Sequence, residues 1–376
     1  MTNHWNDIAN SDVIMIIGSN AAENHPVSFK YVQKALDKGA KLCVVDPRYT
    51  RTASKASFVS GSQLYSKLRS GTDIAFMLGM MRYAVASGRV NWQYLRDCTN
   101  APYLINSGFE TCRVASSVPV TLSPTPITGT FSGLVDDPRR HKKYKYDKTT
   151  WAYQFAGPGQ PAVDSAYWGA PNSGLVSLSG SPNANSVWAK FLEQISSYTV
   201  NMVSDITGAD PAAINAVYDA YTSTYLDHKS ACIMYAMGST QHTYGSQNVR
   251  SYAMMQLLLG NAGVAGGGIN ALRGESNVQG STDMCLLWHI LPGYLAVTNT
   301  SPGKGTRAAY KDGYSTGKSG LDSTPGDPVS LSWWKFGGKY LDSLLQAWWP
   351  IETGVTQDQA YHFLPKADKD MWYTHE

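Results

Sequence analysis

The first part of the chain alternates between short apolar runs and segments whose apolar residues recur at helical spacing. Val13–Ile17 and Leu42–Val45 are continuous apolar runs of strand length. Between them, the segment VSFKYVQKALDKGA has helical spacing and ends at Lys38-Gly39, a common helix stop. This strand–helix–strand order predicts parallel strands joined by a right-handed crossover.

Polar turns follow both predicted strands. The first strand is followed by Gly18-Ser19-Asn20 and the second by Asp46-Pro47-Arg48. Ligands of open parallel sheets bind at the carboxyl ends of the strands, so we expect a binding site at this edge. Further along, Gly71-Thr72-Asp73 precedes a predicted helix from Ile74 to about Ala86, with Thr72 or Asp73 as its N-cap.

Regular patterns return near Val187. Trp188–Tyr198 and Pro211–Thr222 have the spacing of amphipathic helices, and Asp210 is placed to cap the second one. Ala231–Met237 is an apolar run that predicts a buried strand, and Asn248–Gly260 again has a helical pattern. This part of the chain therefore predicts a second α/β segment.

The residues from about 99 to 187 show no lasting periodicity. Frequent Pro, Gly, Ser and Thr predict a long irregular insertion on the surface. Its aromatic residues, Trp151 and Trp168 among them, favour loops pinned to a core, and a carbohydrate-binding platform is the alternative. The chain thus divides into a first α/β segment (1–98), this insertion (99–187), a second α/β segment (188–297) and an aromatic-rich tail that we interpret as an incomplete domain (298–376).

A glycine-rich loop follows the last predicted helix. Gly263–Asp283 holds six glycines, and Arg273 is its only cation. Glycines let a backbone approach a ligand closely and turn its N–H groups toward it. The planar guanidinium suits a carboxylate or phosphate held at two points. The loop is therefore interpreted as a cradle for an anionic cofactor and a small anion, and composition alone leaves a plain surface connection equally open.

Bulk composition excludes several classes of function. Charged residues make up 16% of the 376 residues and the net charge is +3, so we expect no nucleic-acid partner. The basic cluster at 139–148 is interpreted as a solvated loop. The five cysteines form no CxxC pair, which argues against an iron–sulfur or zinc site in this chain, and Cys43 and Cys232 are interpreted as core residues. No apolar run is long enough to cross a membrane, and the first residues lack signal-peptide features.

The loop AGGGINALRGESNVQGSTD resembles the active-site loop of molybdenum- or tungsten-dependent formate dehydrogenase catalytic subunits. Further segments resemble the same family in the same order: MTNHWNDIANSDVIMIIGSNAAENHPVSFK, VVDPRYTRTAS, LRSGTDIAF and YAMGSTQHTYGSQNVRSYAMMQLLLGN. The resemblance covers most of residues 1–295. It implies parallel-sheet, Rossmann-like three-layer α/β domains, two molybdopterin guanine dinucleotides with molybdenum or tungsten, and the oxidation of formate to CO2 or its reverse.

The resemblance also implies which residues contact the cofactor. Asp46 and Arg48 match the guanine and ribose contact, although Asp46 alone would be interpreted as a turn cap. Glu23 matches part of a second contact, with a carboxylate interacting with a helix dipole as the alternative. The implied cofactor-binding residues are Gly18, Asn20, Glu23, Asp46, Arg48, Gly71, Asp73, Met237, Gly238, Gln241, Gly274 and Asn277.

Arg273 matches the arginine that holds the formate carboxylate in this family. Glu275 is a second substrate candidate, where relatives carry Gln or His. His242 is a candidate proton carrier, since histidine titrates near neutral pH, and a packed structural histidine is the alternative. Ser239 departs from the tryptophan that is frequent in the family. His25 is interpreted as structural.

The family's remaining parts lie outside the matched region. An iron–sulfur segment and the cysteine or selenocysteine that ligates the metal precede the position of Met1 in relatives, and a further cofactor domain follows. We therefore expect an internal fragment with no metal ligand of its own. Its expected partners are the remainder of the catalytic subunit and an iron–sulfur electron-transfer subunit, and we expect little or no formate oxidation by the isolated chain. One hypothesis is that Met1 marks the start of an open reading frame downstream of a selenocysteine UGA codon that was read as a stop codon.

Two other interpretations stay open, and the compartment is set by resemblance alone. Another oxidoreductase of the superfamily could share the nucleotide loops, and a catalytically silent cofactor-binding module could share the fold. A nicotinamide dehydrogenase is disfavoured, because GSNAAE stands where GxGxxG would follow the first strand. Resemblance favours the periplasm and leaves the cytoplasm open.

Overall fold

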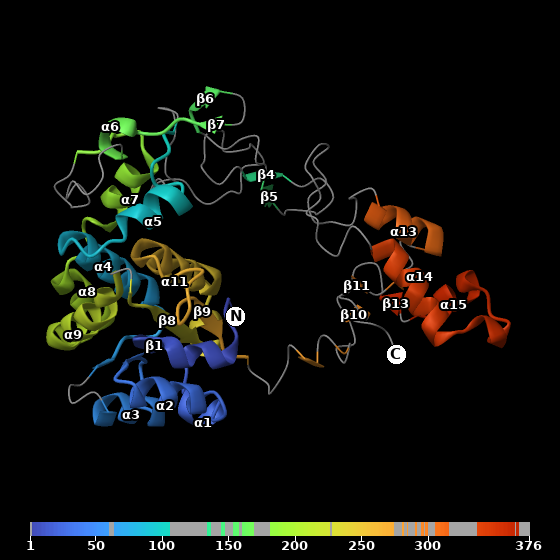
Figure 1. The fold of residues 1–376 in the computed structure, drawn as a ribbon, viewed down its shortest axis with the longest axis horizontal. Coiled ribbons are helices and arrows are strands. Elements are labelled where there is room, and N and C mark those ends of the chain that lie inside the picture. Colours follow the sequence, from blue (N-terminus) through green and yellow to red (C-terminus); the bar gives the residue numbers. More distant parts are fainter. Residues whose placement is uncertain are drawn as a thin grey trace. The chain divides into compact units, whose positions relative to one another are not determined.

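The structure is a computed structural model that divides into two compact units, Met1–Gly274 and Glu275–Glu376 (Figure 1). The described residues are 2–59, 64–105, 134–136, 144–146, 153–157, 160–168, 181–225, 228–273, 280–281, 284, 290–291, 295–296, 298–299, 305–315, 337–364 and 366–367.

A five-stranded sheet organises the first unit. Its order is β3-β2-β1-β8-β9, and every neighbouring pair is parallel. The strands are β1 (Val13–Ile17), β2 (Lys41–Val45), β3 (Tyr65–Ser66), β8 (Ala231–Tyr235) and β9 (Ile269–Ala271). Every residue of β1 is buried, as the continuous apolar run predicts for a central strand covered on both faces. The predicted parallel arrangement of the first two strands is confirmed.

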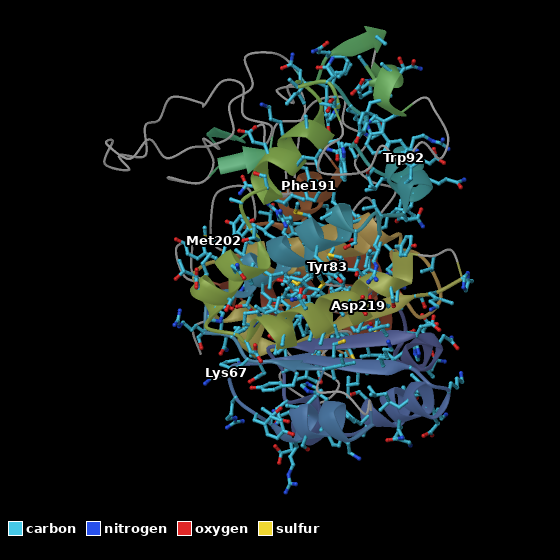
Figure 2. All side chains as sticks on the ribbon, turned by 90° about the vertical axis from the view of Figure 1, so that its left-hand side faces the viewer. Lys67, Tyr83, Trp92, Phe191, Met202 and Asp219 are labelled. Carbon is cyan, nitrogen blue, oxygen red and sulfur yellow. The ribbon has the colours of Figure 1, made fainter. Side chains whose placement is uncertain are left out.

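Helices cover both faces of this sheet, so the unit has three layers (Figure 1, Figure 2). One face carries η1 (Trp5–Asn10), α1 (Ala21–Asn24), α2 (Phe29–Asp37) and α3 (Arg51–Val59), and the other carries α4 (Asp73–Ala86), α8 (Val200–Thr207), α9 (Pro211–Thr222) and α11 (Gly245–Leu259). Side chains of β1 alternate between two cores, with Met15 in one and Ile16 in the other. The predicted α/β fold class is confirmed.

The helix signals in the sequence place these elements to within a few residues. Asp210 caps α9 through its side chain, which accepts from the Ala212 N–H at 3.0 Å. Thr72 occupies the N-cap of α4, which confirms one of the two predicted positions, and its hydroxyl donates to the Arg69 carbonyl at 2.6 Å instead of capping the helix. Helix α11 begins at Gly245, before the predicted Asn248. The other helices of this unit are α5 (Trp92–Cys98), α6 (Ser165–Trp168), α7 (Val187–Ile195), η3 (Ser223–Tyr225) and α10 (Met237–Thr240).

The irregular segment after residue 99 contributes to the core where it is described. Trp168 is only 2% exposed and stacks on Trp92 with ring centroids 4.0 Å apart. Tyr167 is also buried in the same cluster. The expectation of a surface insertion is therefore wrong at α6, and the interpretation of aromatics that pin loops to a core is confirmed there. Trp151 lies outside the described residues.

Two hairpins pair β4 (Leu134–Asp136) with β5 (Tyr144–Tyr146) and β6 (Phe155–Gly157) with β7 (Gln160–Pro161).

The second unit has its own small core. Buried Leu341 and Leu345 pack with Tyr310 and Tyr361. Arg307 forms ion pairs with two aspartates of this unit. Its elements are β10 (Ile290–Leu291), β11 (Leu295–Ala296), β12 (Thr298–Asn299), α13 (Arg307–Ser315), α14 (Gly337–Trp348), η5 (Ile351–Thr353), α15 (Gln357–Phe363) and β13 (Lys366–Ala367). Across the described parts of both units, no helix is both long and apolar enough to cross a membrane.

Candidate functional site

The turns after β1 and β8 meet at the carboxyl edge of the sheet. A Cβ atom added to Gly238 would lie 2.5 Å from the Gly18 carbonyl oxygen, which is far inside van der Waals contact. Gly18 itself has φ +59° and faces the Ser239 hydroxyl. Both positions therefore require glycine, because the two backbones touch there. This close approach brings the Gly18 turn and helix α10 into one surface.

A pocket of about 390 Å³ opens beside these turns. Residues from the carboxyl ends of β1, β2, β3 and β8 line it, and it lies where ligands bind on open parallel sheets. The lining residues are Gly18, Val45, Asp46, Pro47, Arg48, Leu68, Ser70, Asp73, Met237, Gly238, Gln241 and His242. The structure thus brings most of the predicted cofactor-binding residues that it describes to one place.

Asp46 is half-buried in this pocket. Its Oδ1 accepts a hydrogen bond from the Arg48 N–H at 2.9 Å, the geometry of a turn closed by an aspartate side chain. The Tyr65 hydroxyl donates to the Asp46 carbonyl at 3.0 Å. Burial raises the pKa of Asp46, and the N–H and positive charge of Arg48 oppose that rise. The turn-capping alternative is therefore correct locally, and it holds the carboxylate at the pocket wall.

Asp73 is the second carboxylate of the pocket and is only 3% exposed. The Tyr252 hydroxyl from α11 lies 3.3 Å from its Oδ1 and donates to Ser239 Oγ at 2.8 Å. Burial raises the pKa of Asp73, while its own N–H, nearby His242 and Tyr252 lower it. A buried carboxyl whose pKa is raised in a cleft is a typical functional candidate.

Ser239, the departure from the family pattern, is completely buried. Its hydroxyl donates to the Ile17 carbonyl at 3.2 Å, and its own carbonyl accepts from Asn248 Nδ2 at 2.9 Å. These bonds tie the end of β1 to α10 and α11. Ser239 therefore holds these three elements together next to the pocket.

His242 and Gly71 adjoin each other at the pocket rim. The His242 ring donates through Nε2 to the Gly238 carbonyl at 2.8 Å. A Cβ atom on Gly71 would lie 3.9 Å from His242 Nδ1, so Gly71 sits beside the pocket, although it is not among the lining residues. The histidine has a structural hydrogen bond and also faces the pocket.

Asn20 and Glu23 lie beside a neighbouring pocket of about 410 Å³. Asn20 donates to the Glu23 carboxylate, and its Oδ1 accepts from the Thr52 hydroxyl at 3.0 Å. Arg48 lines both pockets. The second pocket is lined by Glu23, Arg48, Tyr49, Thr50, Arg51 and Ser54.

Arg51 also lines the second pocket and is not among the residues predicted from the sequence. It is the first residue of α3 and shares its pocket with Arg48. The signal was present, because the sequence PRYTR places a second arginine three residues after Arg48. Two cations therefore line the surface next to the Asp46 turn.

Arg273 stands two residues beyond the end of β9, and its side chain is exposed. The preceding residue, Leu272, donates its N–H to the Tyr235 carbonyl at 2.7 Å. Burial raises the pKa of Tyr235, and the charge of Arg273 opposes that rise. Within the described part of the chain, no carboxylate forms an ion pair with Arg273. Predicted Gly274, Glu275 and Asn277 lie outside the described residues.

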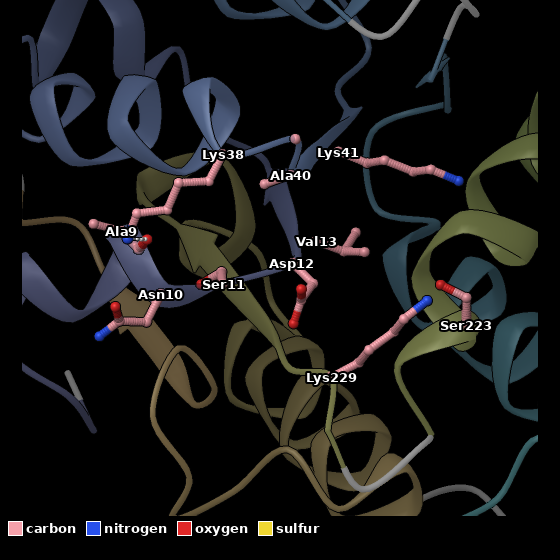
Figure 3. Close-up of a pocket in the computed structure, with 11 residues that line it drawn as sticks. Ala9, Asn10, Ser11, Asp12, Val13, Lys38, Ala40, Lys41, Ser223 and Lys229 are labelled. Atoms are coloured by element: carbon pink, nitrogen blue, oxygen red, sulfur yellow. Dashed lines mark hydrogen bonds between the residues drawn. The ribbon is translucent and has the colours of Figure 1, made fainter.

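A third pocket, of about 310 Å³, lies at the opposite, amino-terminal edge of the sheet (Figure 3). Lys38, Lys41 and Lys229 surround it, together with Asp12. None of the predicted site residues lines it. All three lysines are exposed, and open parallel sheets bind ligands at the other edge, so we assign the candidate site to the carboxyl edge.

The comparison with known families decides the affiliation. The profile of the molybdopterin oxidoreductases matches residues 1–324. The chain belongs to the molybdopterin oxidoreductase family. This affiliation agrees with the α/β fold and with the family resemblance of the glycine-rich loop. Among the described residues, no group of three His, Cys, Asp or Glu side chains is placed to hold a metal ion.

Relatives of this chain include named formate dehydrogenase subunits. It is 40% identical over 374 residues to the formate dehydrogenase subunit alpha of Megalodesulfovibrio gigas, covering 100% of this chain and 32% of the relative. It is 36% identical to the nitrate-inducible formate dehydrogenase major subunit of Escherichia coli, covering 98% of this chain and 32% of that one. The chain thus spans about a third of these relatives.

A solved structure, acetylene hydratase from Pelobacter acetylenicus, aligns with 70% of this chain and 25% of its own, at 16% identity and a TM-score of 0.39.

Proposed function

We propose that this chain is part of the catalytic subunit of a formate dehydrogenase, which interconverts formate and CO2. In this proposal the carboxyl edge of the sheet binds molybdopterin guanine dinucleotide, and Arg273 binds the formate carboxylate. The observation that carries the proposal is the convergence of predicted residues from separate strand ends, Gly18, Asp46 and Gly238, on one pocket. The identity to formate dehydrogenase subunits supports the same assignment.

The chemistry of the pocket fits a guanine nucleotide. Guanine presents two neighbouring donors, N1–H and N2–H₂, and a carboxylate can accept both. Asp46 and Asp73 offer two carboxyl groups in one pocket, each with a pKa raised by burial. Donors on the ligand would replace the hydration that burial removes and would favour the ionised form of either group.

The neighbouring cations fit the phosphates of such a ligand. Arg48 lines both pockets, and Arg51 lines the second. Guanidinium groups bind phosphate oxygens at two points, which fixes orientation as well as affinity. We propose that the base lies against the two carboxylates and that the phosphates extend toward the two arginines.

Arg273 would bind and orient the substrate. Its exposed guanidinium has no carboxylate partner among the described residues, so its donors can meet a small anion. Formate is a planar carboxylate that two parallel N–H groups can hold. When bound, the molybdenum or tungsten centre supplies the two-electron chemistry. The chain itself supplies binding and orientation.

We propose that the activity requires the remainder of the catalytic subunit and an iron–sulfur partner subunit. The family resemblance assigns the metal's cysteine or selenocysteine ligand to sequence other than these residues. The isolated chain should therefore bind nucleotide weakly and oxidise formate little or not at all.

Two measurements on matched samples test the proposed function. Metal and guanine nucleotide are quantified in the purified complete enzyme that carries this sequence, and dye-linked formate oxidation is measured in the same preparation. We expect both guanine nucleotide and formate-dependent dye reduction. Nucleotide and metal without formate oxidation, but with reduction of another oxyanion, would assign the chain to a different member of the family.

A further inference from the structure

His25 contacts the backbone of Arg273 across 248 positions of the sequence. Its ring Nε2 forms a hydrogen bond with the main-chain carbonyl oxygen of Arg273. A carbonyl only accepts, so Nε2 must carry the proton and donate. The contact joins the C-terminal end of α1, the helix that follows β1, to the residues just after β9. Strand β8 lies between β1 and β9 in the sheet.

The backbone of His25 is fixed from both sides. Its N–H donates to the Ala21 carbonyl at 2.9 Å. Its carbonyl accepts from the Ser28 N–H at 3.0 Å and from the Ser28 hydroxyl at 2.6 Å. Pro26 follows directly and restricts the conformations that His25 can adopt. The backbone that carries the imidazole is therefore held in one conformation.

The other ring nitrogen of His25 has no such partner. Nδ1 is buried and has no hydrogen-bond partner among the described residues. Leaving a buried polar atom unpaired destabilises the folded state. Among the described residues, the only hydrogen bond of this ring is the one from Nε2 to the Arg273 carbonyl. The position of the ring therefore satisfies this bond and leaves Nδ1 unpaired.

The bond from His25 holds the Arg273 carbonyl, which is on the C-terminal side of the Arg273 Cα atom. On the N-terminal side, Leu272 is only 3% exposed and donates its N–H to the Tyr235 carbonyl. A side chain leaves its Cα in a direction set by the backbone on both sides. With the backbone held on both sides of its Cα atom, the exposed guanidinium starts from a defined position, although Arg273 lies in the middle of the glycine-rich segment Gly263–Asp283.

We propose that His25 is a positioning residue for Arg273, holding its carbonyl so that the guanidinium meets a small carboxylate substrate. This inference rests on the proposed function for its substrate. It assigns to His25 a role beyond that of a packed structural histidine.

The test uses the complete enzyme that carries this sequence and three variants. His25→Phe keeps a flat ring and removes the donor. His25→Gln restores a donor, because its amide nitrogen lies about where Nε2 does. His228→Phe is the matched control, since His228 is exposed in the turn before β8. Amide hydrogen exchange of the peptide covering residues 269–273 and the KM and kcat for formate are measured for each.

We expect His25→Phe to raise exchange at Leu272 and Arg273 by about tenfold, because losing one anchoring bond favours local opening. The KM for formate should rise about tenfold, with a much smaller change in kcat. His25→Gln should bring the amide exchange rate and the KM for formate most of the way back to the parent values. His228→Phe should match the parent enzyme in both quantities.

Two results would overturn the inference. One is unchanged exchange in His25→Phe, and the other is faster exchange with an unchanged KM for formate. A failure of the proposed function has a different signature, because Arg273→Lys would then leave formate kinetics unchanged. In that case the exchange measurement still decides whether His25 anchors Arg273.

Discussion

The backbones of Gly18 and Gly238 touch at the point where β1 and β8 end, since a Cβ atom on Gly238 would lie 2.5 Å from the Gly18 oxygen. That contact brings the turn after β1 against α10 and forms one wall of the candidate pocket. The pocket therefore depends on two glycines more than 200 residues apart in the sequence.

Gly238→Ala should destabilise the chain by about 1–3 kcal/mol, because backbone atoms must shift to admit the added methyl group. Urea unfolding of the purified chain measures this. Gly157→Ala is the control, since no atom lies within 4 Å of the place that its added methyl group would take. Equal midpoints for the two variants would mean that the close approach is absent.

Asp73→Asn should stabilise the ligand-free chain near neutral pH. Burial raises the pKa of Asp73 above its usual 3.8, so the folded state holds this proton more tightly than the unfolded state does. The stability that the parent gains from this protonated carboxyl is complete below about pH 3.8, and it is lost as the pH rises through the pKa that Asp73 has in the folded state. The variant's advantage over the parent should thus grow with pH and disappear in acid.

Urea unfolding of the parent and Asp73→Asn across a pH series measures this difference. Asp205→Asn, at an exposed position on α8, is the control and should track the parent. A stability difference that does not vary with pH would show that burial does not perturb the Asp73 carboxyl. Guanine nucleotide affinity should fall in Asp73→Asn even though stability rises.

Arg48→Gln should weaken the binding of guanosine diphosphate, used as a probe, by about tenfold. Arg48 lines both neighbouring pockets, so its loss removes a cation from the path proposed for the phosphates. Isothermal titration at two salt concentrations measures the effect, and the salt dependence should also decrease. Arg96→Gln, which changes an arginine paired with Asp97 and lining neither pocket, should bind like the parent. Equal affinity of Arg48→Gln and the parent would remove Arg48 from the proposed site.

The sheet and the convergence of the predicted turns on one pocket were predictable because they follow from local patterns. The apolar run of β1 identifies a strand buried on both faces, and the turns at Gly18 and Asp46 follow strands at their carboxyl ends. Parallel strands bring such turns together whatever their distance in the sequence. The side chains that support the site were not predictable in this way.

Those supporting contacts depend on tertiary packing. Ser239 is a weak match to the family in the sequence, and only its burial between Ile17 and Tyr252 explains a hydroxyl there. His25 is interpreted as a structural histidine until its contact with Arg273 is known. Neither contact leaves a periodic signal, because each joins segments whose proximity is set by the strand order.

The formate kinetics of Arg273→Lys in the complete enzyme test the central claim most directly, with Arg96→Lys as the surface control. A lysine keeps the charge but cannot supply two parallel hydrogen bonds to a carboxylate. We predict that kcat/KM for formate falls by at least about tenfold in Arg273→Lys and stays at the parent value in Arg96→Lys. An unchanged kcat/KM in Arg273→Lys would contradict the assignment of this guanidinium to the substrate.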